Sequence, residues 1–350
     1  MLMQIRENVS LKDFSSMRLG GNCRYLIEVN TKDELIEALN WIKDSALPYR
    51  MIGGGYNIIW KDEGFNGVLL VNKILSVESR VFKNTKIKIR LGAGETWDNT
   101  VEKFTSEGFS GIECLSFIPG NCGSAVIQNI GAYGVEISGV IESVEVYDTK
   151  LNQFTIIDKN DCGFSYRDSR FKSVDKNRFL IIYVNIILEK KNPTGPYYEA
   201  IALYLSENER IQTITPTVLR DIVIAVRQSK LPDPEIIPNV GSFFYNPVID
   251  RTIFDKLLIK FPEMKNWPID ERKVKISAGW LIDNVGYRHK YDNDKFDPKT
   301  GMATWSFQRL TLVNRAAKST ADLLKFKQEI VDKVHNKFGI FLEQEPELLP

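Results

Sequence analysis

The chain has 350 residues, a length that allows two or three domains. Its 46 lysines and arginines nearly balance its 45 aspartates and glutamates, and the net charge of +1 argues against a protein that mainly grips nucleic acid. Only two histidines are present, so a three-histidine metal site is excluded and we expect no metal.

The cysteines and the apolar segments indicate where the protein works. None of the four cysteines lies in a CxxC pair, which favours reduced thiols in a cytoplasmic protein. The first residues lack the apolar stretch of a signal peptide, and no run of about 18 apolar residues follows. We therefore expect no membrane partner.

The first half of the chain alternates predicted strands and helices. A strand is expected over residues 24–29, followed by a helix with Thr31 as N-cap and Glu34 as its capping-box partner. Apolar residues from Leu35 onward recur at helical spacing. Short runs rich in β-branched and aromatic residues predict further strands over 49–52, 67–71, 86–91, 140–147 and 179–188.

The second half begins after a breaker-rich segment, residues 190–197, which is a candidate domain boundary. Pro216 suits the first position of a helix that residues 230–234 end. A turn and strand are expected over 241–249, and a surface loop over 292–300. The last helix is predicted to begin after Ser319 and to end at Gly339.

Two glycine-rich segments are candidates for binding a ligand. Residues 53–57 (GGGYN) let backbone amides approach an anion, although a tight turn explains them equally well and the pattern is not GxGxxG. Residues 118–136 (IPGNCGSAVIQNIGAYGVE) suit neither a strand nor a helix, and we interpret them as a wall around a large flat ligand. Long loops of this kind are uncommon unless they are functional.

Two further segments combine reactive and charged side chains. Residues 166–169 (YRDS) place a phenol, a guanidinium, a carboxylate and a hydroxyl together, and in a strand Arg167 and Ser169 would share a face. Residues 230–234 (KLPDP) precede the turn 241–247 (GSFFYNP), which presents Ser242. A surface salt bridge and a plain hairpin turn are the structural alternatives.

In this order the segments, together with SAGWLID at 277–283, resemble the UDP-N-acetylenolpyruvoylglucosamine reductase (UDP-N-acetylmuramate dehydrogenase, MurB) family of type I, from about Asn8 to Pro346. The resemblance implies an α+β and α/β architecture: an FAD-binding p-cresol methylhydroxylase-type fold of two subdomains, plus a C-terminal α/β substrate-binding domain. The expected divisions are 1–75 joined by the tail 340–350, then 76–212, then 213–339.

The resemblance also implies the ligands. FAD is the cofactor, NADPH the reductant, and the substrate a nucleotide sugar whose enolpyruvyl group is reduced in peptidoglycan precursor synthesis. The implied cofactor-binding residues are Gly53, Gly54, Gly55, Tyr56, Asn57, Pro119, Gly120, Gly123, Ser124, Gln128, Asn129, Gly131, Ala132 and Tyr133. The implied substrate-binding residues are Tyr198, Arg227, Lys230, Asn246 and Gln308.

Three residues match the catalytic positions of the family. Arg167 would stabilise the developing enolate, Ser242 would give a proton to the carbanion, and Glu345 would assist as a protonated donor. Glu347 stays an alternative to Glu345, because a match slipped by two residues selects it.

The chain departs from the family pattern around the substrate. Tyr56 replaces a serine in the glycine loop, Tyr245 replaces a lysine, and residues 305–308 read WSFQ where HRQQ is usual. Residues 198–201 read YEAI where YGDL is usual. These changes leave open a divergent flavoenzyme acting on another nucleotide sugar, or a flavin-binding protein without activity. We expect a monomer, and the choice between NADPH and NADH stays open.

Overall fold

The computed structural model describes residues 3–350, and the chain divides into two compact units. The first unit holds the residues up to Val9 together with Cys23–Gly54 and Asn66–Arg227. The second holds Ser10–Asn22, Gly55–Phe65 and Gln228–Pro350. No helix among the described residues is long and apolar enough to cross a membrane.

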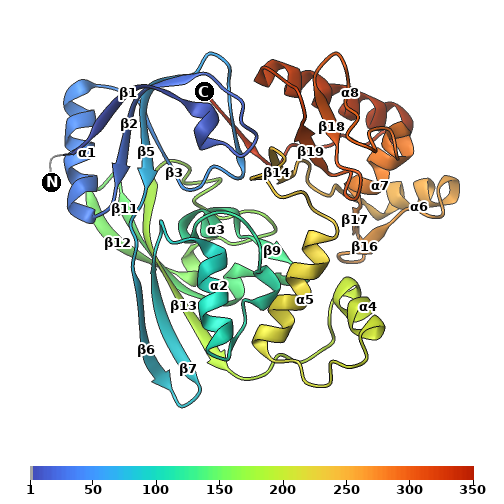
Figure 1. Ribbon diagram of the computed structural model, residues 1–350, viewed down its shortest axis with the longest axis horizontal. Helices are drawn as coiled ribbons and strands as arrows, with labels where there is room; N and C mark the ends of the chain where they lie inside the picture. Colours follow the sequence, from blue (N-terminus) through green and yellow to red (C-terminus); the bar gives the residue numbers. More distant parts are fainter. Residues whose placement is uncertain (1–2) are drawn as a thin grey trace. The chain divides into compact units, whose positions relative to one another are not determined.

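A four-stranded sheet covered by one helix forms one part of the first unit (Figure 1). Its strands, in spatial order, are β1 (Ile5–Ser10), β2 (Asn22–Val29), β5 (Phe65–Asn72) and β3 (Tyr49–Ile52). Helix α1 (Lys32–Ser45) buries Leu35, Ala38 and Ile42, the apolar stripe that its sequence predicts. Thr31 caps α1, but the Glu34 carboxylate accepts from the N–H of Asn30, one residue before the expected partner.

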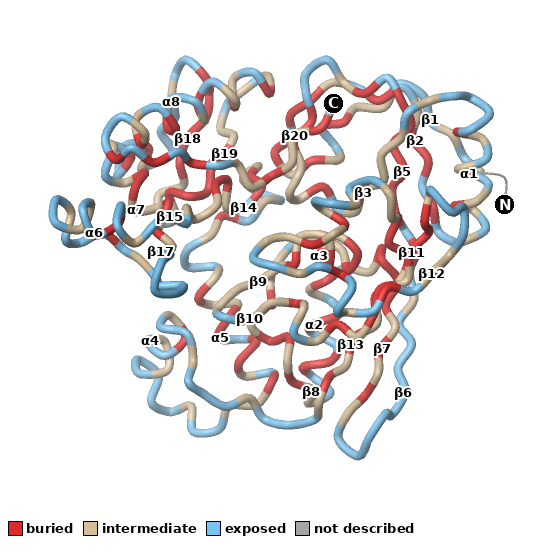
Figure 2. The backbone as a smooth tube through the Cα atoms, turned by 180° about the vertical axis from the view of Figure 1, so that it is seen from behind, coloured by how far each residue is buried: buried red, intermediate tan, exposed pale blue. Residues whose placement is uncertain are grey.

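A six-stranded antiparallel sheet forms the other part of the first unit. Its strands are β12 (Gln153–Asp158), β11 (Ile141–Asp148), β13 (Phe179–Lys190), β7 (Lys86–Gly92) and β6 (Val77–Lys83), with β8 (Phe109–Ser110) beside β13. Helices α2 (Trp97–Ser106) and α3 (Cys122–Gln128) bury their apolar residues in the core of this sheet, and α4 (Glu199–Glu207) packs with α5 (Pro216–Gln228). Figure 2 shows β13 and β11 largely buried and the edge strand β6 exposed.

Residues 118–136 are not the unstructured wall that their composition suggested. They contain α3 and a short hairpin of β9 (Gly131–Ala132) and β10 (Val135–Glu136). Asn121 and Ser124 cap α3 reciprocally, and Gly123 lets α3 approach the end of β7, where an added Cβ would lie 2.8 Å from the Cβ of Ala93. The glycine that made a helix look unfavourable is therefore what allows this helix to pack.

The second unit contains three small sheets. They are β14 (Asn239–Ser242), β19 (Thr311–Asn314) and β18 (Met302–Thr304); β15 (Val248–Asp250), β17 (Lys273–Ile276) and β16 (Asn266–Pro268); and β20 (Glu347–Leu349) parallel to β4 (Ile58–Trp60). The helices are α6 (Arg251–Lys260), α7 (Ala278–Ile282) and α8 (Thr320–Phe338). Ser319 and Asp322 form the capping box of α8, and Gly339 ends it in the left-handed conformation, so the predicted start after Ser319 and end at Gly339 are confirmed.

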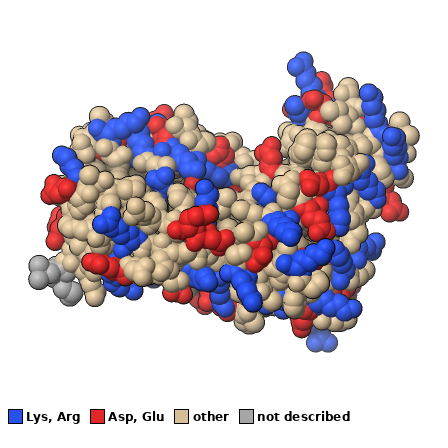
Figure 3. Space-filling view, turned by 90° about the horizontal axis from the view of Figure 1, so that it is seen from above, with Lys and Arg blue, Asp and Glu red and all other residues tan. Residues whose placement is uncertain are grey.

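Charged side chains of both signs are interspersed over the face in Figure 3. This distribution agrees with the near-zero net charge of the sequence. The absence of a nucleic-acid partner stays a prediction.

Candidate active site

The first part of the glycine loop lies against the start of α3. A Cβ on Gly53 would lie 3.1 Å from Oδ1 of Asn121 and 3.4 Å from the side chain of Ser124. Asn121 is held in turn, because its side-chain amide donates to the carbonyl of Gly94 at 2.6 Å. Because Gly53 has no side chain, its backbone stays accessible beside Asn121 and Ser124. A Cβ at this position would narrow the space between the loop and α3.

The second part of the loop is fixed within the second unit. Gly55 has φ of +78°, and a Cβ there would lie 2.4 Å from the carbonyl oxygen of Phe14, so only glycine fits. The Tyr56 hydroxyl donates to Oε1 of Glu235 at 2.9 Å. Burial, reinforced by Glu235, raises the pKa of Tyr56 to about 12, so this phenol stays neutral.

Arg167 lies in a tight turn and not in a strand, so the expected face shared with Ser169 does not form. Its φ is +55°, a left-handed conformation that a non-glycine residue adopts only where its surroundings impose it. One restraint is Lys172, whose ammonium donates to the Arg167 carbonyl at 3.1 Å and to Oε1 of Gln128 at 2.6 Å. The Arg167 guanidinium itself donates to the carbonyl of Gly131.

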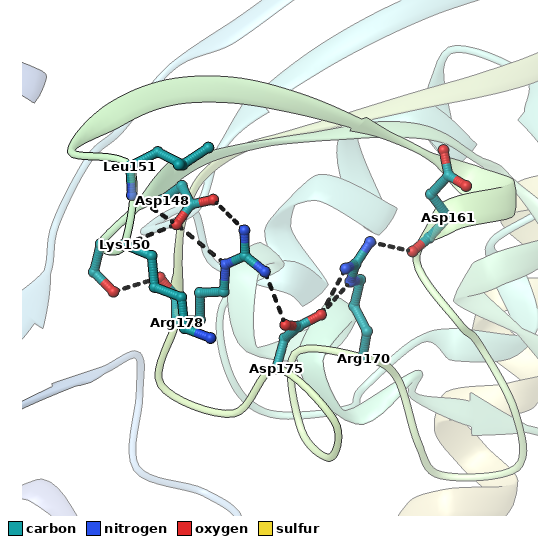
Figure 4. A network of polar contacts seen from close by, with 8 residues as sticks. Asp148, Lys150, Leu151, Asp161, Arg170, Asp175 and Arg178 are labelled. Carbon is teal, nitrogen blue, oxygen red and sulfur yellow. Dashed lines mark hydrogen bonds and ion pairs between the residues drawn. The ribbon is translucent and has the colours of Figure 1, made fainter.

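A ladder of charges holds the loop that carries Arg167 (Figure 4). Arg170 donates twice to one oxygen of Asp175, and Arg178 joins Asp175 to Asp148. Hydrogen bonds from Arg178 and from backbone N–H groups hold the pKa of Asp148 below its usual range despite burial. The loop is therefore anchored on β11, a largely buried strand of the sheet.

Asn129 is fully buried, and its side-chain amide forms hydrogen bonds with other groups of the protein. It donates to Glu136 and to the carbonyl of Ser165, and accepts from the N–H of Ser138. Ser169 is also buried and donates to the carbonyl of Ile127. Both side chains fasten the Arg167 turn to the end of α3.

Arg227, Arg167 and Tyr133 interact at the end of α5. Burial lowers the pKa of Arg227 and the positive charge of Arg167 lowers it further, while Tyr133 and Asp98 act in the opposite direction. Tyr133 also meets Tyr198 edge to face, with 5.7 Å between ring centroids. The positive charge of Arg167 thus reaches the largely buried guanidinium of Arg227.

Ser242 ends β14, and Glu345 lies in an extended segment of the second unit that meets the residues after β14 at the isolated bridge of Phe244 with Gln344. The N–H of Glu345 donates to the carbonyl of Phe243 at 2.9 Å, next to Ser242 in the chain. Glu347 lies elsewhere, because it belongs to β20 and its N–H donates to the carbonyl of Asn57. The backbones of the two glutamates thus have different neighbours, and the choice of Glu345 over Glu347 stays a prediction.

Asn246 and Gln308 converge on the start of α7. Oδ1 of Asn246 accepts from the N–H of Ala278 at 3.0 Å. Oε1 of Gln308 would lie 3.2 Å from a Cβ on Gly279, so this glycine leaves room for the amide. Lys230 lies exposed after α5.

Sequence reasoning missed Arg309, which is 7% exposed. It donates to the carbonyl of Trp305 at 3.0 Å and faces the carboxylates of Asp283 and Asp292 at 3.4 and 3.8 Å. It therefore stabilises the turn that presents Gln308. An arginine directly before the apolar run of β19 is the only signal that pointed to it. In the described part of the chain, no group of histidine, cysteine and acidic residues could hold a metal.

Comparisons with known proteins point to one family. A family model of an FAD binding domain matches residues 23–150, and the model of the UDP-N-acetylenolpyruvoylglucosamine reductase C-terminal domain matches residues 232–349. Proteins named UDP-N-acetylenolpyruvoylglucosamine reductase are similar along nearly the whole chain. The one from Ralstonia nicotianae is 34% identical and covers 95% of both chains, and the one from Idiomarina loihiensis is 35% identical and covers 97% of this chain and 96% of its own.

A solved structure shares the fold. The crystal structure of UDP-N-acetylenolpyruvylglucosamine reductase (MurB) from Thermus caldophilus superposes with a TM-score of 0.66 at 23% identity, covering 100% of both chains. The predicted fold class is thereby confirmed.

Proposed function

The chain belongs to the UDP-N-acetylenolpyruvoylglucosamine reductase family, and we propose that it reduces UDP-N-acetylglucosamine enolpyruvate to UDP-N-acetylmuramate with NADPH. The observation that carries the proposal is 34–35% identity over at least 95% of the chain to proteins of this name. These relatives do not favour the alternative of a different nucleotide sugar.

The residues present fit FAD. Gly53 provides the uncovered backbone described above, and residues Ile118–Tyr133 would line the flavin beside it, within the first unit. The neutral phenol of Tyr56 adds no negative charge near the flavin phosphates. When bound and reduced by NADPH, FAD supplies the hydride that the enolpyruvyl double bond receives.

Arg167 would stabilise the negative charge that develops on the substrate. Its guanidinium is a permanent cation, and the turn that carries it is locked by Lys172, Asn129 and the ladder of Figure 4. A charge that is already oriented need not reorganise when the enolate forms, and this preorganisation lowers the barrier. Arg227 and Tyr198 would bind other anionic and polar groups of the nucleotide sugar.

Ser242 would deliver the proton to the substrate carbon, and Glu345 would assist it. The two side chains come from adjacent extended segments joined by the hydrogen bond between Glu345 and Phe243. A serine hydroxyl is a weak acid, so it works only beside a strong base such as a carbanion. Asn246, Gln308 and Lys230 would hold the substrate in place.

Further features of the protein remain part of the proposal. We propose that the protein is a monomer. We also propose that it works in a reducing compartment, the cytoplasm, since all four cysteines are free thiols and three of them are buried. We also retain the three divisions expected from the sequence, 1–75 with 340–350, 76–212 and 213–339.

Half-reactions test the proposal. Purified protein should absorb as a flavoprotein and release FAD on denaturation, NADPH should bleach the flavin, and the enolpyruvyl substrate should restore its colour. In Ser242→Ala the bleaching should persist, while the reoxidation slows at least ~10²-fold. Equal losses in both half-reactions would show that Ser242 is structural, and a protein that binds no FAD would refute the proposed function.

A further inference from the structure

Ser242 has a cross-strand neighbour, Thr311. The two residues lie opposite one another in the antiparallel pair of β14 and β19. The adjacent hydrogen bond runs from the N–H of Phe243 to the carbonyl of Leu310 at 2.8 Å, which makes Ser242 and Thr311 a non-hydrogen-bonded pair. Side chains of such a pair point to the same face of the sheet and approach most closely.

Thr311 buries a hydroxyl that no protein group satisfies. The residue is 0% exposed, and within residues 3–350 its Oγ1 has no hydrogen-bond partner. Buried polar groups nearly always have partners, because an unpaired one destabilises the fold. A valine would fill the same space without this loss, so the hydroxyl calls for a role beyond packing.

A third polar atom extends the row. In the pair of β18 and β19, Thr304 lies opposite Leu312, so the next residue, Trp305, lies opposite Thr311. The backbone N–H of Trp305 donates to the carbonyl of Thr311 at 2.9 Å. Thr311 thus has Ser242 as its neighbour on one edge of β19 and Trp305 on the other edge. The indole Nε1 of Trp305 is likewise buried without a partner among the described residues. Ser242, Thr311 and Trp305 therefore lie side by side on one face of the sheet.

We propose that Thr311 is a positioning residue for Ser242, an inference that rests on the proposed function. A rotation of the Ser242 side chain about χ1 places its Oγ beside Oγ1 of Thr311, which donates a hydrogen bond to it. The Trp305 indole can only donate, and both it and Oγ1 of Thr311 are unpaired in the structure; a small shift that lets the indole donate to Oγ1 of Thr311 would direct the Thr311 hydroxyl toward Ser242. The row of Trp305, Thr311 and Ser242 thus ends at Oγ of Ser242, the atom that gives up its proton.

The proton balance is simple. The O–H bond of Ser242 breaks as the new C–H bond of the product forms, and the electron pair stays on Oγ of Ser242. The hydrogen bond from Thr311 strengthens as this charge appears, so it stabilises the transition state more than the ground state. Solvent water returns a proton to the half-buried Ser242 afterwards, and Thr311 keeps its own.

Matched variants of the FAD-loaded protein test the proposal. Thr311→Val removes the hydroxyl and keeps the shape, and Thr311→Ser keeps the hydroxyl. Thr304→Val is the control, because Thr304 is also buried with an unpartnered hydroxyl but lies in β18 on the opposite face. Single-turnover flavin reoxidation by the enolpyruvyl substrate, its solvent deuterium isotope effect and thermal unfolding are measured for each.

We expect Thr311→Val to slow reoxidation at least about tenfold and to raise its isotope effect, with bleaching by NADPH unchanged. Thr311→Ser should come within about threefold of the wild type, and Thr304→Val should match it. Neither valine variant should lower the Tm, since each removes an unpaired hydroxyl. In a Ser242→Ala background, Thr311→Val should have no further effect, because there is no alkoxide left to stabilise.

Two results would overturn the inference. One is reoxidation in Thr311→Val at the wild-type rate while Ser242→Ala is slow. The other is an equal loss in Thr311→Val and Thr304→Val, which would reflect packing. A wild type that does not reduce the substrate, or a Ser242→Ala variant that reoxidises normally, would instead refute the proposed function or the role of Ser242.

Discussion

The ion pair between Asp98 on α2 and Arg220 on α5 should hold the first unit together. Arg220 donates to both carboxylate oxygens of Asp98, at 2.6 and 2.9 Å. Asp98 also accepts from the N–H of Phe117, whose carbonyl accepts from Arg227. Because Phe117 has φ of +57°, these two hydrogen bonds fix an unfavourable backbone conformation beside the cofactor segment. Asp98→Asn should therefore loosen both the unit and its binding residues.

The size of the effect follows from burial. The Arg220 side chain is 8% exposed and that of Asp98 is 24% exposed. Removing one partner of a fully buried pair costs about 3–5 kcal/mol, because the other charge is left uncompensated. Allowing for the partial exposure of Asp98, we expect about 2–4 kcal/mol, or a fall in Tm of about 4–16 °C for a unit of this length.

The same pair predicts a pH dependence. Burial by itself raises the pKa of Asp98, but the hydrogen bonds from Arg220 and Phe117 outweigh it and hold the pKa below its usual value. A depressed folded-state pKa gives stability that is present above the unfolded value of about 3.9 and is lost as the pH falls through the folded value. The advantage of the wild type over Asp98→Asn should be complete near pH 6 and shrink below about pH 4.

Urea and thermal unfolding across pH measure both effects. Glu107→Gln is the matched control, since Glu107 follows α2 and forms an exposed pair with Lys103 at 3.1 Å. It should change stability by less than about 0.5 kcal/mol. Equal stability of the Asp98→Asn and Glu107→Gln variants would refute the reasoning, and so would a wild-type advantage that persists unchanged in acid.

Three further predictions concern the site. Gly131→Ala places a Cβ 2.7 Å from Nη1 of Arg167, so the flexible guanidinium must move. In single-turnover assays, flavin reoxidation by the substrate should therefore slow at least about tenfold, while bleaching of the flavin by NADPH stays unchanged. Tyr56→Phe should keep FAD affinity within about threefold by fluorescence titration, because the hydroxyl is committed to a carboxylate; a tenfold loss would place it on the flavin. Glu345→Gln should slow reoxidation at least ~10²-fold and Glu347→Gln less than tenfold, and the reverse order would favour Glu347.

Local signals allowed much of the fold to be predicted. The helix after Ser319 begins and ends where Ser319 and Gly339 predicted. The run at residues 179–188 is apolar and β-branched, and it becomes the central strand β13. In each case the residues that define the element lie within it, so no distant partner is needed to recognise it.

Other elements depend on distant partners that no local pattern reveals. Helix α3 needs Gly123 against Ala93 and a cap held by Gly94, so its own composition is misleading. The left-handed conformation of Arg167 depends on Lys172 and on the end of α3. Tertiary contacts outweigh local propensity at such positions. The motif predicts a role for Arg167, but the conformation of this residue comes from the fold.

The departures from the family pattern gain a physical interpretation when their partners are known. Tyr56 replaces a small hydroxyl, yet its phenol bonds Glu235, which lies beside the segment that carries Lys230. Trp305 lies in the altered WSFQ segment, and its backbone N–H donates to the carbonyl of Thr311, the residue opposite Ser242. Both substitutions lie next to residues for which we propose binding or catalytic roles, and they leave Arg167, Ser242 and Glu345 unchanged in identity. These substitutions alter the surroundings of the three groups and not the groups themselves. We therefore expect them to change the rate of the reaction and the affinity for substrate, while the type of reaction stays the same.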